Sequence, residues 1–385
     1  MEQELHFDSI ISFIRGMYPE KSYVGLHEPV FCGNERKYVL DAIDSTYVSS
    51  VGSYVNLFEE MMAKITGTRY AVAIVNGTNA LHIALMLAGV TRGEEVITQA
   101  LTFIATANAI SYNGAYPVFV DVDNDTLGMS PEALSSFLAN NVVKKSDGAY
   151  NKITGRRIAA CVPMHTFGLP CRIDEIRQIC DNWNIPLVED AAESLGSYYD
   201  GKHTGSFGLV GVFSFNGNKT VTSGGGGAIV TDDECIARRA KHLTTQAKVP
   251  HRWDFVHDEI GYNFRMPNLN AAFACAQLEQ LDKFISDKRL LAKAYEDFFG
   301  RIGVPFMKEI PEATANYWLN AILFQDRTHR DSFLAFSNNN GVMTRPVWEL
   351  MTRLKMFRDC QSDGLSNSIW IADRLVNIPS GFRSR

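Results

Sequence analysis

Three polar segments could do chemistry, and each directly follows or ends an apolar run that is typical of a buried strand. The first is Gly77-Thr78-Asn79, which follows the run YAVAIVN at residues 70–76 and begins an amphipathic segment. Free backbone N–H groups at the start of a helix can hold a phosphate dianion. A purely structural turn with a polar cap would give the same pattern, so this segment alone leaves both interpretations open.

The other two segments present a carboxylate and an amine. Asp190 ends the run IPLVED, and Lys219 lies in FSFNGNK, ahead of four glycines at 224–227. A buried carboxylate needs a cationic or hydrogen-bonding partner, which a protonated pyridine nitrogen would provide. A lysine beside a glycine-rich turn can bring its amine close to a bound cofactor. The structural alternatives are a helix cap at Asp190 and a solvated side chain at Lys219.

A mostly parallel sheet would bring these strand ends together at one edge. From about residue 70 onward, short apolar runs alternate with amphipathic segments, as in strands that are joined by crossover helices. Ser130-Pro131 predicts a capped helix start within this rhythm. In its strand, Glu189 should point to the face opposite to Asp190.

The sequence changes in character after residue 205. A glycine-dense stretch predicts short strands joined by tight turns, and a helical segment from Asn268 through the 290s leads into the C-terminal part. We therefore expect an α/β protein with a mostly parallel central sheet flanked by helices and a smaller C-terminal α/β domain. The expected division is 1–265, an N-terminal arm with the large cofactor-binding domain, and 266–385, the linking helices with the smaller domain.

Composition excludes several classes of protein. Of the 385 residues, 46% are hydrophobic and 21% charged, as in ordinary globular proteins, and the net charge of −6 argues against nucleic acid or an anionic membrane as a partner. The seven cysteines form no CxxC pair or zinc pattern, which favours reduced thiols and predicts no metal site. The N-terminus lacks the apolar core of a signal peptide, so we expect a cytoplasmic protein.

Five motifs follow one another along the chain: GTxALH, TFxATANA, VEDAAExLG, FSFxxxKxxxxGGGG and GYNxRMxNLNAA. Their order resembles the DegT/DnrJ/StrS family of nucleotide-sugar aminotransferases, which use pyridoxal 5'-phosphate and have the aspartate-aminotransferase (type I) fold. The resemblance extends from about Val24 to the closing VNIPSGF, which is nearly the whole chain.

The resemblance implies a role for each residue that matches a family motif. Lys219 would hold the cofactor as a Schiff base and then move the proton between substrate and cofactor. Asp190 would keep the pyridine nitrogen protonated. Glu193 would lie near the phenolic oxygen of the cofactor, where an ionised carboxylate would repel a phenolate unless one of the two holds a proton.

Further residues would hold the ring and the phosphate. Phe103 would stack on the ring, although a core phenylalanine is the alternative. Ser214, together with Gly77-Thr78-Asn79, would hold the phosphate. Asn263, with Arg265 close by, would reach the phosphate in the neighbouring subunit, so the resemblance implies a homodimer with the active site at the interface.

The substrate follows from the resemblance as well. The segments TYVSSVG (46–52) and FNGNK resemble the branch that aminates UDP-4-keto-6-deoxy-N-acetylglucosamine with glutamate as donor, as in bacillosamine or legionaminic-type pathways of surface glycan synthesis. The alternatives are a 3-keto nucleotide-sugar aminotransferase, a related sugar dehydratase and a non-catalytic regulator. The dehydratases carry His in place of the lysine, and a regulator would not need Lys219 or Asp190.

Overall fold

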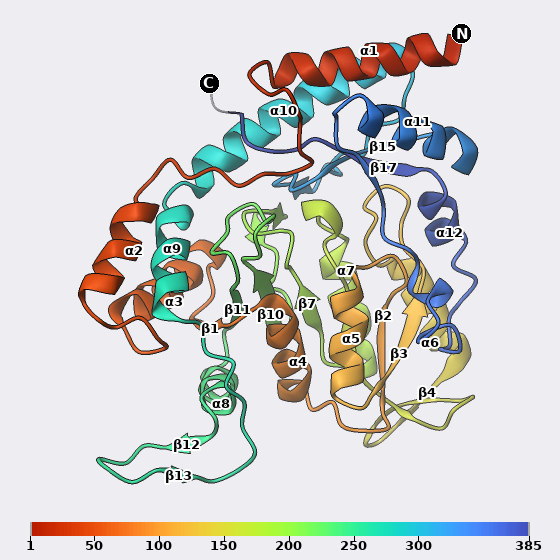
Figure 1. Ribbon diagram of the computed structural model, residues 1–385. Coiled ribbons are helices and arrows are strands. Elements are labelled where there is room, and N and C mark those ends of the chain that lie inside the picture. Colours follow the sequence, from red (N-terminus) through yellow and green to blue (C-terminus); the bar gives the residue numbers. More distant parts are fainter. Residues whose placement is uncertain (1, 384–385) are drawn as a thin grey trace.

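The structure of the chain is a computed structural model that describes residues 2–383, and a large sheet lies at its centre (Figure 1). The strands of this sheet are β1 (Tyr70–Ile74), β2 (Glu95–Gln99), β3 (Tyr116–Val120), β4 (Val142–Lys145), β5 (Gly148–Asn151), β6 (Arg157–Val162), β7 (Val188–Asp190), β10 (Val210–Ser214) and β11 (Gly227–Thr231). They pair in the orders β3-β2-β6-β5-β4 and β1-β11-β10-β7. Parallel bridges from Cys161 to Leu187 and from Met164 to Asp190 join the two groups.

The central sheet is mostly parallel. All of its strands run in one direction except β5 and β11, as the pairings and the bridges show. Both β2 and β11 are buried along their whole length, which is typical of a sheet that is covered on both faces. The predicted α/β fold with a mostly parallel sheet is confirmed.

Helices cover the two faces of the sheet and form separate cores. The helix α4 (Gly77–Leu87) contributes to the core on one face, and α3 (Ser53–Thr66) and α9 (Asn268–Leu278) contribute to the core on the other. Successive side chains of β10 point to opposite faces of the sheet: Val212 packs in the core with α4, and Phe213 packs in the core with α3 and α9. The other helices before α9 and after α1 are α2 (Glu35–Asp44), α5 (Ile104–Tyr112), α6 (Pro131–Asn141), α7 (Ile173–Trp183) and α8 (Glu234–Thr244).

Local sequence explains where several helices begin and end. The Ser130 hydroxyl accepts a hydrogen bond from the Ala133 N–H and Pro131 follows at the first helical position, which confirms the predicted start of α6. The helical segment predicted from Asn268 consists of two helices, α9 and α10 (Leu281–Ile302). Glu279 and Gln280 form a turn between these two helices.

The C-terminal part adds a smaller α/β layer. An antiparallel sheet of β15 (Asn320–Leu323), β17 (Leu375–Ile378) and β16 (Arg345–Pro346) packs with α10, α11 (Arg327–Asn339) and α12 (Ser366–Ala372). The N-terminal helix α1 (Glu2–Met17) lies beside α10 and α11, and its Ile10 and Ile14 share a core with Tyr295 and Phe333 (Figure 1). The predicted division after residue 265 stays a prediction. Among the described helices, none is both long and apolar enough to cross a membrane.

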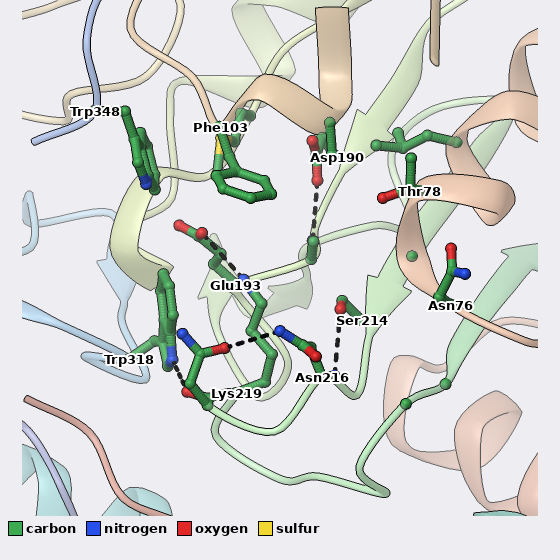
Figure 2. Close-up of a pocket in the computed structure, with 18 residues that line it drawn as sticks. Asn76, Thr78, Phe103, Asp190, Glu193, Ser214, Asn216, Lys219, Trp318 and Trp348 are labelled. Atoms are coloured by element: carbon green, nitrogen blue, oxygen red, sulfur yellow. Dashed lines mark hydrogen bonds and ion pairs between the residues drawn. The ribbon is translucent and has the colours of Figure 1, made fainter. Parts of the chain in front are cut away.

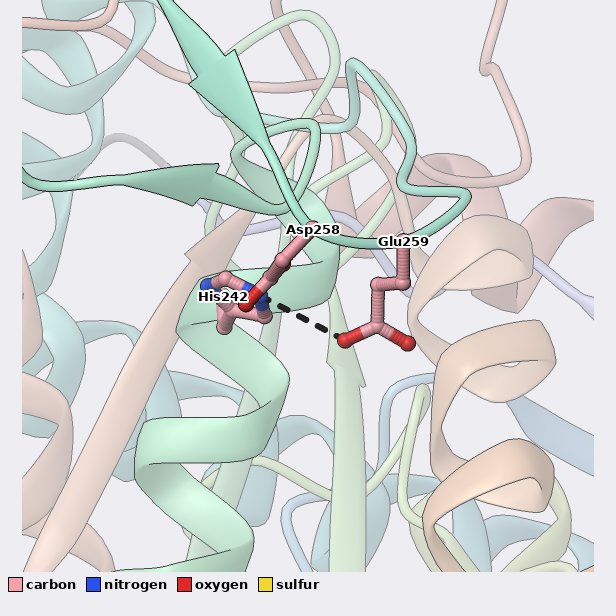
Figure 3. A group of neighbouring side chains, drawn as sticks. All are labelled: His242, Asp258 and Glu259. Carbon is pink, nitrogen blue, oxygen red and sulfur yellow. Dashed lines mark hydrogen bonds and ion pairs between the residues drawn. The ribbon is translucent and has the colours of Figure 1, made fainter.

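A hairpin projects from the body of the molecule at residues 248–260 (Figure 1). It contains β12 (Lys248–Val249) and β13 (Val256–His257), and its apolar side chains are exposed, with Phe255 at 81% and Ile260 at 86%. At its base, the Nε2 atom of His242 on α8 lies 2.8 Å from the Asp258 carboxylate and 3.4 Å from that of Glu259 (Figure 3). We call residues 248–260 the arm; this hairpin is distinct from the N-terminal arm that was expected from the sequence.

The strand β7 presents two carboxylates to opposite sides. Glu189 accepts hydrogen bonds from the N–H groups of Gly205, Phe207 and Gly208 and lies 3.1 Å from His165 Nε2. Asp190 instead faces a pocket, so the predicted orientation of the pair is confirmed. Glu189 therefore fixes the loop that leads into β10 and the residues beyond it.

Candidate active site

The pocket lies at the carboxyl ends of the parallel strands and has a volume of about 310 Å³ (Figure 2). It brings together residues from all three segments that follow strands, as in other sheets of this class. Predicted site residues that line it are Gly77, Thr78, Phe103, Asp190, Glu193, Ser214 and Lys219. The three segments therefore meet at one edge of the sheet, as expected for strand ends of a mostly parallel sheet.

One end of the pocket is the N-terminus of α4. The Asn76 side chain caps this helix by accepting the Asn79 N–H at 2.8 Å, whereas helix geometry leaves the N–H groups of Gly77 and Thr78 without an intrahelical acceptor. A Cβ atom on Gly77 would lie 2.8 Å from the Ser214 Cβ, so only glycine allows β10 to approach this closely. Free N–H groups, a hydroxyl and the helix dipole together suit a phosphate group.

Asp190 is a buried carboxylate with few partners. Its Oδ2 accepts a hydrogen bond of 2.7 Å from the Thr106 hydroxyl, and its Oδ1 accepts one of 3.2 Å from the Ala192 N–H. Burial raises the pKa of Asp190, and the Thr106 hydrogen bond opposes this shift. No helix begins at Asp190, so the helix-cap alternative is wrong. The carboxylate keeps lone pairs that a cationic group in the pocket could use.

Lys219 and Glu193 form an ion pair across the pocket (Figure 2). The Lys219 Nζ lies 3.1 Å from Glu193 Oε1, and Glu193 Oε2 accepts a hydrogen bond of 2.9 Å from the Phe167 N–H. Burial raises the pKa of Glu193 to about 7, although the neighbouring Lys219 lowers it. The Lys219 side chain is only 13% exposed, so it is not the solvated surface lysine of the alternative interpretation.

The turn that carries Lys219 is held by a tryptophan from the C-terminal part. The Trp318 Nε1–H donates a hydrogen bond of 2.6 Å to the Asn218 carbonyl, and the Lys219 Nζ lies 3.9 Å from the centre of the Trp318 ring. Within the turn, the Lys219 N–H donates to the Asn216 carbonyl at 3.0 Å. The amine is therefore positioned by its own turn, by Glu193 and by an aromatic face.

The mouth of the pocket is aromatic. Phe103 is 47% exposed and lies at the start of α5, so it is not the core phenylalanine of the alternative interpretation. Its ring centre lies 6.0 Å from that of Trp348, at an interplanar angle of 61°. A flat ring bound in the pocket would have the Phe103 side chain available to cover it.

Two predicted residues do not line this pocket. The Asn79 N–H is used by the Asn76 cap, and the Asn263 side chain accepts hydrogen bonds from Arg265 at 2.8 Å and 3.1 Å. Because Asn263 was predicted to act in a neighbouring subunit, a single chain does not test its role. The lining residues that sequence reasoning missed or left out include Asn216, Asn218, Trp318 and Trp348.

The side chains that line the pocket provide little positive charge for an anionic ligand. Among the described residues that line it, Lys219 is the one cation, and it stands beside the carboxylates of Asp190 and Glu193. A phosphate at the α4 N-terminus needs no side-chain cation. Any second anionic group would need positive charge from outside this set of residues.

Comparisons with known proteins agree with this site. A sequence model described as the DegT/DnrJ/EryC1/StrS aminotransferase family matches residues 32–383. The GDP-perosamine synthase of Escherichia coli O157:H7 is 37% identical over 360 residues, which is 93% of each chain. EpsN of Bacillus subtilis (strain 168), provisionally named a pyridoxal phosphate-dependent aminotransferase, is 37% identical over 333 residues, 86% of this chain and 83% of its own.

The fold has relatives among solved structures. The aminotransferase TlmJ from Streptoalloteichus hindustanus superposes with a TM-score of 0.84 at 25% sequence identity, covering 92% of this chain and 93% of that one. The predicted fold class is therefore confirmed by a solved aminotransferase.

The raised pKa of Glu193 predicts a pH-dependent stability in the cofactor-free protein. Its pKa is about 7 in the folded chain against 4.5 for an unperturbed Glu, so the stability it contributes is present at low pH and lost as the pH rises through 7. The thermal midpoint of Glu193→Gln minus that of wild type should therefore be larger at about pH 8 than at about pH 5, by roughly 3–6 °C. Differential scanning calorimetry of both proteins measures this difference.

A matched control is Glu132→Gln, which changes an exposed acid on α6. It should shift the midpoint equally at both pH values. A Glu193→Gln difference that does not change with pH would show that Glu193 is ionised over the whole range.

Proposed function

Because the chain belongs to the DegT/DnrJ/EryC1/StrS aminotransferase family, we propose that it transfers an amino group from glutamate to a keto sugar carried on a nucleotide, with Lys219 as the catalytic lysine. One observation carries this proposal. Lys219, Asp190 and the N-terminus of α4 face a single pocket, each with the chemistry that a different part of one cofactor requires.

The enzyme is an aminotransferase that uses pyridoxal phosphate, which, when bound, supplies an electron-withdrawing ring that stabilises negative charge on the substrate carbon. The pocket fits this group. The N–H groups of Gly77 and Thr78 and the Ser214 hydroxyl would hold the phosphate, because the missing Cβ of Gly77 leaves them close together. Asp190 would keep the ring nitrogen protonated, and Phe103 would cover the ring.

Lys219 and Glu193 divide the proton handling between them. The Lys219 amine would hold the cofactor covalently and, as a free amine, would take and return the substrate proton. Glu193, with a pKa of about 7, holds a proton at neutral pH when its cationic partner is engaged elsewhere, so it can donate a hydrogen bond to the phenolic oxygen. The predicted repulsion between carboxylate and phenolate is thereby avoided.

The substrate is proposed to be a 4-keto-6-deoxy sugar linked to a nucleoside diphosphate, used in surface glycan synthesis. The relative named GDP-perosamine synthase supports a GDP-linked sugar, because it matches this chain over nearly its whole length. The segments TYVSSVG and FNGNK support the UDP-linked alternative, UDP-4-keto-6-deoxy-N-acetylglucosamine. Both substrates are acted on at the same Lys219, so the choice depends on the nucleotide subsite.

A homodimer with shared active sites would supply the missing positive charge. Among the described residues that line the pocket there is one cation, whereas a nucleotide sugar brings a diphosphate in addition to the cofactor phosphate. The arm exposes large apolar side chains and carries Lys248 and Arg252, as a segment that packs on a second copy would. Asn263 and Arg265, which follow the arm in the chain, are the proposed contacts to the partner's phosphate. The cytoplasmic location stays a prediction.

The substrate is tested with a panel of GDP- and UDP-linked 3-keto and 4-keto sugars, each supplied with glutamate. We expect amination of a 4-keto compound, with the product identified by NMR, and a loss of at least about 10³-fold in Lys219→Ala together with loss of the yellow colour. The control Lys355→Ala, which changes an exposed lysine, should keep both. Activity on a free keto acid alone would contradict the nucleotide-sugar assignment but not the role of Lys219.

Shared active sites predict complementation between two inactive variants. Lys219→Ala damages the site of its own chain, and Asn263→Ala damages the site of its partner. In a mixed dimer both lesions fall in one site and the other is intact, so equal co-expression should restore about one quarter of wild-type activity. Mixing Lys219→Ala with Asp190→Ala is the control. Both residues act in the site of their own chain, so each site of a mixed dimer lacks either Lys219 or Asp190. Activity in the control, or none in the test pair, would contradict a shared site.

A further inference from the structure

The segment Asn316–Trp318 connects the C-terminal part to the reacting lysine. Trp318 places its ring 3.9 Å from the Lys219 Nζ and donates a hydrogen bond to the Asn218 carbonyl in the turn that carries Lys219. The Asn316 side chain donates to the carbonyl of Glu193 at 2.9 Å and accepts from the Trp318 N–H at 2.8 Å. One short segment thus contacts both members of the Lys219–Glu193 pair.

The backbone of this segment is strained. Tyr317 has a φ of 49°, in the left-handed region that a non-glycine residue enters only when its surroundings impose it. The direction of the Trp318 ring depends on this bend, because Trp318 is the next residue. Some neighbouring group must hold the Tyr317–Trp318 backbone in place.

Lys288 on α10 is that group. Its side chain is buried, with 1% of the residue exposed, and its Nζ donates to three carbonyl oxygens: those of Tyr317 at 3.2 Å, Trp318 at 3.1 Å and Ser380 at 2.6 Å. All three donors of the ammonium group are therefore used on backbone. A buried ammonium is costly for stability, so a role in fixing this backbone explains its presence better than general stabilisation.

The other charged and titratable groups around Lys288 leave it without a carboxylate of its own. Asp287, its neighbour on α10, binds the Arg383 guanidinium at 2.8 Å. His27, from the segment before α2, has two buried ring nitrogens without hydrogen-bond partners, and burial together with Lys288 and Lys219 holds its pKa well below the usual value. Burial likewise lowers the pKa of Lys288 to about 7, and the nearby Asp287 opposes this shift. The hydrogen bonds of the Lys288 amine go to the three carbonyl oxygens.

We propose that Lys288 is a positioning residue for the reaction at Lys219, because its ammonium group fixes the Tyr317–Trp318 backbone and, through it, the ring of Trp318 against the Lys219 amine. This inference rests on the proposed function of Lys219. The indole face lies 3.9 Å from the Lys219 Nζ in a cation–π geometry and restricts the directions that the side chain can take. Loss of Lys288 would therefore free the Lys219 amine without removing any group that touches the substrate.

The test compares Lys288→Met with wild type in the cofactor-free protein. At neutral pH, an amine-reactive reagent followed by mass spectrometry of the Lys219 peptide should show labelling about 2- to 10-fold faster in the variant. In the loaded enzyme, kcat should fall by about 10-fold while KM for glutamate changes little. Lys288→Arg should restore part of both, and Lys293→Met, on the exposed side of the same helix, should behave as wild type. A folded Lys288→Met protein with wild-type labelling and kcat would overturn the proposal.

A second variant keeps the test decisive if Lys288→Met does not fold. Trp318→Leu removes the ring and should also speed labelling of Lys219. Where Lys288→Met does fold, the double variant should show no further increase, because both substitutions act through one contact. Unchanged labelling in Trp318→Leu would overturn the proposal independently of Lys288. A colourless wild-type protein would instead refute the proposed function, while the labelling of the cofactor-free chain would still report on Lys288.

Discussion

The buried ion pair between Lys219 and Glu193 is the constraint on which the site depends. A buried ammonium and carboxylate persist only when further hydrogen bonds offset their lost hydration. The Phe167 N–H supplies one to Glu193, and Trp318 shields Lys219 with its ring. These groups come from segments far apart in the chain, so the pair can form only after the large sheet and the C-terminal part have packed together.

The same pocket gives two carboxylates different hydrogen-bonding partners. Burial raises the pKa of both Asp190 and Glu193, but Asp190 has only a hydroxyl and one N–H as partners, whereas Glu193 has the Lys219 amine. Asp190 therefore gains most from a new cationic partner in the pocket. Glu193 gains most from a proton once Lys219 is used elsewhere. In the proposed function, this division would let one site hold a protonated ring nitrogen beside Asp190 and a proton on Glu193 near the phenolic oxygen of the cofactor.

Strand ends and helix starts could be predicted because they depend on local sequence. The runs before Asp190 and Lys219, the alternation of Glu189 with Asp190, and the start of α6 at Ser130 follow from period and capping. The contact between Trp318 and Lys219 could not be predicted, because the two residues are 99 positions apart in the sequence and the segment ANYWLN contains no pattern that indicates a contact with Lys219. The use of the Asn79 N–H by Asn76 likewise depends on the geometry of one cap.

The most direct test of the account is to locate the lysine that carries the cofactor. The purified protein is reduced with borohydride while the cofactor is bound, digested, and analysed by peptide mass spectrometry. The account predicts the mass of the reduced cofactor on the peptide that contains Lys219 and on no other. The label on Lys288 or on any other lysine, or on none, would contradict the assignment of Lys219.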